Sequence, residues 1–127
     1  MTYYIAKTVS GGFDDVIARV TEALKAEGFG VLTDIDVAAT MKKKLDVDFR
    51  PYRILGACNP QMALKALTAE SKIGVMLPCN VIVQQTDDGV EVAAVDPVAS
   101  MQAVDNPGLA EIAGPVKDAL KRVVEAL

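Results

Sequence analysis

The sequence predicts an α+β fold of two layers, in which helices pack on one face of a curved, largely antiparallel sheet. Segments with two-residue alternation of apolar side chains are interspersed with segments of helical spacing, a mixture typical of this class. Asp87-Asp88-Gly89 separates two apolar runs and is typical of an antiparallel hairpin. The length of 127 residues suits a single domain over residues 1–127 with one core.

Composition restricts the class of protein. Hydrophobic residues make up 51% of the chain, but charged residues make up 24% and no apolar run reaches the roughly 20 residues of a membrane span. The N-terminal residues lack the pattern of a secretory signal. A net charge of -4 disfavours binding to nucleic acid, and two cysteines make no disulfide framework. We therefore expect a cytoplasmic protein with no nucleic-acid or membrane partner.

The first half of the chain predicts strand, helix, strand and short helix. Branched and aromatic residues alternate before Ser10-Gly11-Gly12, and helical spacing then follows with Asp14 and Asp15 in the first turn, where the helix dipole favours negative charge. A second stretch alternates with Phe29, Val31, Thr33 and Ile35 on one face, and it leads to Asp36, which can cap the next helix. The expected elements are a strand over residues 3–9, a helix from Phe13 that stops at Gly28, a strand over 29–36 and a short helix that ends near Leu45.

The second half begins with an apolar strand over residues 52–58. Asn59-Pro60 then gives a cap followed by proline at the first helical position, and Lys72-Ile73-Gly74 ends that helix. The helix between them has an apolar face of mostly small residues, suited to close packing on a sheet, made by Met62, Ala63, Ala66, Leu67 and Ala69. Residues 73–77 are expected to be extended. Strands over 81–85 and 90–95 flank the hairpin turn.

The last third of the chain predicts mainly one long helix. Residues 98–104 could form a helical turn, and Asn106-Pro107 repeats the cap and proline opening. Apolar residues keep helical spacing from Leu109 to Leu127. Gly114-Pro115 falls inside this pattern and should kink or break the helix, because proline lacks the N–H donor and crowds the previous turn.

Chain lengths bring five polar or sulfur-bearing residues toward one edge of the sheet. A helix of about 12 residues after Cys58 descends roughly 18 Å, and an extended segment over 73–77 returns about 16 Å. A two-residue hairpin turn would set Asp96 opposite Val81 and close to Cys79. The residues expected at this edge are Cys58, Asn59, Cys79, Asn80 and Asp96.

The chemistry of these residues leaves alternatives open. Cys58 precedes a helix N-terminus, which favours a thiolate, and the asparagines and Asp96 could hold a polar ligand or a soft metal ion. Two thiols and a carboxylate without histidine make an incomplete zinc site, although a dimer could supply more ligands. No C-x-x-C pair is present. The cysteines could equally be small buried apolar residues, with Asn59 and Asn80 capping turns.

Several long strings carry a resemblance to a known family. They are GFGVLTDIDV at residues 28–37, FRPYRILGACNP at 49–60, IGVMLPCNVIV at 73–83 and AVDP at 94–97. With these strings the whole chain resembles the DUF302 family, a domain of unknown function. The resemblance implies a fold similar to that of the TATA-binding protein, a homodimer and no DNA binding. It brings no catalytic role for the residues of the GACNP and LPCN strings, namely Cys58, Asn59, Cys79 and Asn80.

The sequence supports one leading interpretation of function and one alternative. No complete acid–base or nucleophile constellation can be assembled, so we expect a non-catalytic homodimeric binding module with a site beside Cys58 and Cys79 and no required cofactor. The alternative is a thiol-active protein that handles redox equivalents, sulfur or a soft metal ion through the same two cysteines. A pure interaction domain is a third possibility. A hydrolase using Asp96, or a nucleotide site on the lysines at 42–44, has no supporting motif.

Overall fold

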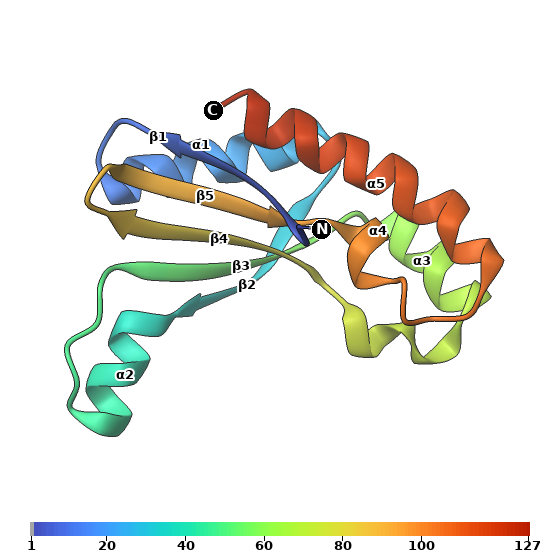
Figure 1. Ribbon diagram of the computed structural model, residues 1–127, viewed down its shortest axis with the longest axis horizontal. Coiled ribbons are helices and arrows are strands. Elements are labelled where there is room, and N and C mark those ends of the chain that lie inside the picture. The colour runs from blue at the N-terminus through green and yellow to red at the C-terminus, as the bar shows by residue number, and fades with distance from the viewer. Residues whose placement is uncertain (1) are drawn as a thin grey trace.

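The computed structural model describes residues 2–127 and contains one open sheet of five antiparallel strands, in the order β1-β5-β4-β3-β2. The sheet and two long helices form two layers, as predicted (Figure 1). In chain order the elements are β1 (Tyr4–Val9), α1 (Phe13–Ala26), β2 (Gly30–Asp36), α2 (Val37–Leu45), β3 (Tyr52–Cys58), α3 (Pro60–Ala69), the 3₁₀ helix η1 (Ser71–Met76), β4 (Cys79–Thr86), β5 (Gly89–Val95), α4 (Pro97–Ser100) and α5 (Pro107–Glu125).

The main core lies between one face of the sheet and the helices α1 and α5 (Figure 1). Each of these helices carries an apolar stripe at helical spacing, and each stripe faces strand residues that point to the same side of the sheet. Burial of each such side chain stabilises the fold by about 1.5–3 kcal/mol. Fully buried members of this core are Val16, Val20 and Leu24 from α1, Leu55, Val81, Val83 and Val92 from the strands, and Leu120 and Val123 from α5.

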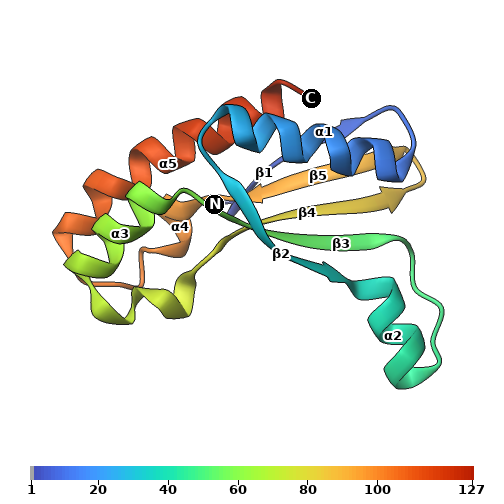
Figure 2. The same cartoon turned by 180° about the vertical axis from the view of Figure 1, so that it is seen from behind.

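A smaller core forms beyond one end of the sheet. Ala66 of α3, Ile73 of η1 and Leu109 of α5 are buried together. They join α3, η1, α4 and the first half of α5 into a lobe that continues the sheet at one end (Figure 2). The space between this lobe and the ends of the central strands is where a cavity forms.

None of the helices among the described residues has both the length and the apolar character that a membrane span requires.

The helix α2 lies apart from both cores. The Asp36 carboxylate caps it by accepting a hydrogen bond from the Ala39 amide at 2.9 Å, as the sequence predicted. No residue of α2 is buried. In both ribbon views the helix projects from the side of the sheet opposite α1 and α5 (Figures 1 and 2).

A β-bulge in β2 changes which side chains share a face. The register shifts between Val31 and Thr33, so Val31 lies opposite Ala57 while Ile35 lies opposite Ile54. Val31 packs against the main core, whereas Ile35 is 49% exposed on the uncovered face. The simple alternation expected from the sequence placed these two residues on one face and was wrong.

Three further expectations need correction. Residues 71–76 form η1 instead of an extended segment, because Ile73 turns inward to fill the small core. The hairpin places Ala94, not Asp96, opposite Val81. The helix α5 runs unbroken through Gly114-Pro115, since Pro115 lies on its exposed face while its neighbours Ala113 and Val116 are anchored in buried contacts.

Candidate functional site

A cavity of about 340 Å³ lies between the ends of β3 and β4 and the lobe formed by α3, η1, α4 and α5. Its volume is within the range of small-molecule sites. Among the described residues that line it there is no charged side chain. The lining residues are Phe29, Leu32, Ala57, Cys58, Asn59, Met62, Ala63, Ala66, Leu67, Gly74, Leu77, Pro78, Cys79, Pro97, Met101, Ile112, Ala113 and Val116.

Small residues create this space. Ala63 and Ala66 on α3 and Ala113 on α5 face the cavity where larger side chains would fill it, and Gly74 of η1 contributes no side chain. The run of small residues on α3 was visible in the sequence as a surface suited to close packing. In the structure it leaves a cavity instead, because α5 and η1 do not fill the gap.

The two cysteines line this cavity from neighbouring strands. Cys79, the first residue of β4, lies opposite Ala57, and Cys58, the last residue of β3, lies opposite Gly30. Both thiols are free and partly buried. Burial, together with the nearby Cys58, raises the pKa of the Cys79 thiol from 9.0 to about 11. Cys79 is therefore a neutral thiol at physiological pH.

Asn59 is the one described lining residue with an oxygen or nitrogen in its side chain. Its carboxamide oxygen caps α3 by accepting a hydrogen bond from the Met62 amide at 3.3 Å, which confirms the predicted cap. Its Nδ2 lies beside Gly28, where an added Cβ would be only 3.2 Å from that nitrogen. Gly28 has a φ of +84°, so glycine suits both this backbone conformation and the close approach of the amide.

Asn80 does not line the cavity. It lies opposite Gly56 on the uncovered face of the sheet and is exposed. There it borders a second hollow together with Tyr52 and Ile82. Its separation from Cys79 follows from the alternation of side chains along a strand, which sends neighbouring residues to opposite faces.

Asp96 lies next to the cavity, where it caps α4 and pairs with a lysine. Its carboxylate accepts hydrogen bonds from the amides of Val98 at 3.0 Å and Ala99 at 3.3 Å, and pairs with the Lys117 ammonium at 3.0 Å. Burial alone would raise the pKa of Asp96, but the hydrogen bond from Lys117, the two amides and the lysine charge outweigh it and lower the pKa. Asp96 thus fixes α4, whose Pro97 lines the cavity.

The sequence interpretation missed the thioethers of this site. Met62 of α3 was assigned only to an apolar helix face, and Met101 follows α4. Helical spacing identified Met62 as apolar, but no local signal links Met101 to the cysteines. The cavity therefore has four sulfur-bearing side chains, while the described residues contain no cluster of three or more His, Cys, Asp or Glu placed for a metal ion.

Comparison with known proteins identifies a family and a solved structure of similar fold. Residues 5–127 match the family model described as domain of unknown function DUF302. The fold is similar to the crystal structure of an uncharacterized conserved protein DUF302 from Bacillus stearothermophilus, with a TM-score of 0.92 and 32% sequence identity over 98% of each chain. No curated protein matches the chain.

Proposed function

The chain belongs to the DUF302 family, and from this premise we propose that it is a non-catalytic, homodimeric module that binds a small neutral apolar molecule in the cavity beside Cys58 and Cys79. The observation that carries the proposal is the cavity lining, in which apolar side chains surround about 340 Å³ without a charged group among the described residues. Sites of this composition hold ligands by burying apolar surface.

The lining also restricts the chemical class of the ligand. An anion or cation would lose its hydration here without gaining an opposite charge, which costs several kcal/mol or more. One carbonyl or hydroxyl group is compatible, because Asn59 is among the lining residues and its Nδ2 is a hydrogen-bond donor. Neutral molecules with one polar end fit this description best.

Titration with the neutral fluorophore N-phenylnaphthylamine tests the proposal. The wild-type protein should bind this probe with a saturable rise in fluorescence. Ala63→Phe should weaken binding at least about tenfold, equivalent to about 1.4 kcal/mol, because the new ring occupies the cavity. Ala110→Phe is the matched control, since Ala110 is exposed on α5 and does not line the cavity.

Two further readouts make the result specific. Bound probe should slow the alkylation of Cys58 by iodoacetamide, and it should raise the melting temperature by mass action. A wild-type protein that binds no probe, or an Ala63→Phe variant that binds as tightly as wild type, would contradict the proposal. Circular dichroism of both variants controls for folding.

A second candidate function is the handling of a soft metal ion by the same cavity, within the broader class of thiol-active proteins. The specific observation in its favour is that the thiols of Cys58 and Cys79 and the thioethers of Met62 and Met101 line one cavity. Thiolate and thioether ligands select copper(I). The metal ion would have to displace the proton from the Cys79 thiol, whose pKa of about 11 favours the protonated form.

Anaerobic titration with copper(I) against a chromophoric chelator separates the two candidates. Metal binding predicts one copper per chain, lost in Cys58→Ser and in Cys79→Ser and weakened in Met62→Leu. Met41→Leu is the control, because Met41 on α2 does not line the cavity. Unchanged binding in both cysteine variants would remove this candidate and leave the apolar-ligand proposal intact.

A further inference from the structure

The face of the sheet opposite α1 and α5 carries an unbroken apolar row. Side chains directly opposite each other in antiparallel strands point to the same face. The register pairs Ala6 with Ala93, Ala93 with Ile82, Ile82 with Ile54, and Ile54 with Ile35, which takes the row across all five strands. No helix of the described chain covers this face (Figures 1 and 2).

Aromatic residues extend this apolar surface. Tyr3, Tyr4 and Tyr52, the three tyrosines of the chain, line a hollow of about 470 Å³ on the same face. Aromatic side chains of this kind are enriched where protein surfaces meet. Together with the row, they make the uncovered face a surface suited to a macromolecular partner.

Three polar or charged side chains at this face are paired with one another. Gln84 accepts a hydrogen bond from the Arg50 guanidinium at 2.8 Å and donates one to the Glu91 carboxylate at 2.8 Å. This internal pairing offers little to a polyanion, and the net charge of -4 opposes one. A partner with an apolar contact surface fits better than a nucleic acid.

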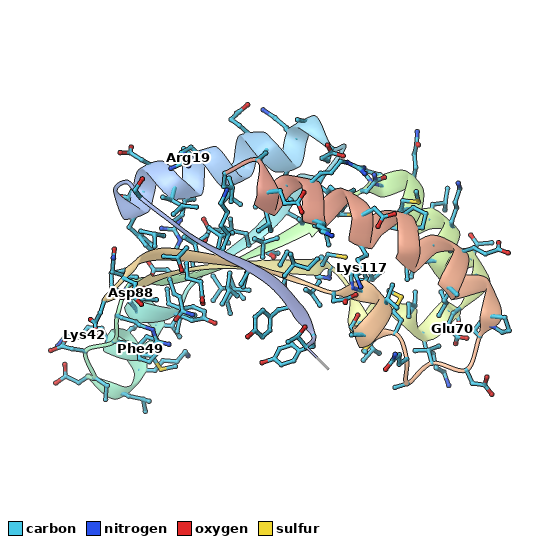
Figure 3. All side chains as sticks on the ribbon, turned by 45° about the horizontal axis from the view of Figure 1, so that its top comes forward. Arg19, Lys42, Phe49, Glu70, Asp88 and Lys117 are labelled. Carbon is cyan, nitrogen blue, oxygen red and sulfur yellow. The ribbon has the colours of Figure 1, made fainter. Side chains whose placement is uncertain are left out.

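The chain itself presents such a surface beside the row. We define the α2 arm as residues 37–51, none of which is buried. In this arm Leu45 is 66% exposed, Val47 is 48% exposed and Phe49 is 37% exposed. It lies on the same side of the sheet as the uncovered face (Figure 1), and Figure 3 labels Lys42 and Phe49 on it.

The surface area of the chain agrees with a missing partner. A compact monomer of 13.4 kDa should expose about 6,500 Å². This chain exposes 7435 Å². The excess of about 900 Å² accompanies an α2 arm with no buried residue, and a stable interface would bury roughly 800 Å² on each subunit.

We propose that a second copy of the chain covers this face, with the α2 arm of each protomer lying on the apolar row of the other. The arrangement is isologous, so one two-fold axis buries two arms and two rows at once. It rests on the homodimer of the proposed function and names the surface that forms it. The ligand cavity lies on the helix side of the sheet and stays outside this interface.

Sedimentation equilibrium of the full chain and of matched variants tests this surface. Wild-type protein should sediment at twice 13.4 kDa at micromolar concentration. Ile82→Glu puts a charge in the centre of the row and should sediment as a monomer. Leu64→Glu is the matched control and should remain dimeric, because Leu64 is 68% exposed on α3, outside the row and the cavity lining.

Two additional variants protect the test against misfolding. Ile35→Glu changes a half-exposed row residue on the edge strand, and Phe49→Ser changes the exposed arm; both should fold and both should weaken dimerisation at least tenfold. Monomeric wild-type protein, or dimers that survive both changes, would overturn the proposal. An Ile82→Glu protein that is monomeric and still binds N-phenylnaphthylamine supports both the dimer surface and the ligand cavity. A wild-type protein that is dimeric but does not bind the probe refutes the ligand cavity and leaves the dimer surface standing.

Discussion

At the scale of single residues, the thiol of Cys79 connects the cavity to the stability of the fold. Burial raises its pKa to about 11, against 9.0 in an exposed chain. Above pH 9 the unfolded chain therefore holds fewer protons at this site than the folded protein does, so the free energy of unfolding falls as pH rises from 9 to 11. The total loss is about 2–3 kcal/mol, since each pKa unit corresponds to about 1.4 kcal/mol.

Urea denaturation of wild type and Cys79→Ala between pH 8 and pH 11 measures this contribution. The comparison isolates this thiol, because every other titratable group is the same in both proteins. The free energy of unfolding of wild type, measured relative to that of Cys79→Ala, should therefore fall by about 2–3 kcal/mol between pH 8 and pH 11. Parallel curves would mean that the thiol is not desolvated in the folded protein.

Asp96 illustrates what the sequence can and cannot predict about a residue. Its place directly after β5 was predictable, but the hairpin register that set it opposite Val81 was wrong. Its partner Lys117 lies on α5, whose position depends on packing against the sheet. A carboxylate that suggested chemistry in the sequence is therefore engaged in capping α4 and pairing with a lysine.

At the scale of elements, two glycines predict opposite responses to the same substitution. A Cβ at Gly114 on α5 would meet nothing within 4 Å, so Gly114→Ala should stabilise the protein by about 0.5–1 kcal/mol through helix propensity. A Cβ at Gly56 on β3 would overlap the Thr33 hydroxyl and lie 2.7 Å from Cγ of Pro78. Gly56→Ala should therefore destabilise it by about 1–3 kcal/mol.

Thermal denaturation of both variants checks this pair. The melting temperature should rise by a few degrees in Gly114→Ala and fall in Gly56→Ala. Pro78 also lines the cavity, so Gly56→Ala should weaken binding of N-phenylnaphthylamine as well. A neutral Gly114→Ala would show that this part of α5 has another constraint.

Local signals predicted the elements whose cause is local. The caps at Asp36, Asn59 and Asn106 lie where the sequence placed them, because capping involves only the next few amides. The wrong predictions concern features that depend on distant contacts. The 3₁₀ helix η1 forms where Ile73 packs against α3 and α5, and the bulge in β2 depends on the pairing of β2 with β3. The two cysteines stood out in the sequence as candidate site residues. The cavity that they line could not be predicted, because it depends on where α5 packs.

At the scale of the whole molecule, sheet order determines which surfaces need a partner. The sequence contained every residue of the apolar row, but the row exists only because the strands are ordered β1-β5-β4-β3-β2 and because the bulge turns Ile35 to the uncovered face. Of the α2 arm, the part up to about Leu45 was predicted as a short helix. Its lack of any buried residue is a property of the assembled fold.

A dimer that depends on this face makes stability depend on protein concentration. Folded dimers dissociate when their subunits unfold, so each tenfold increase in protein concentration stabilises the dimer by about 1.4 kcal/mol. The melting temperature of wild type and of Leu64→Glu should therefore rise by a few degrees per tenfold increase. The melting temperature of Ile82→Glu should be lower and independent of concentration. A wild-type melting temperature that stays constant over a hundredfold range would contradict a dimer coupled to folding, because mass action leaves no other outcome for subunits held together by an apolar face.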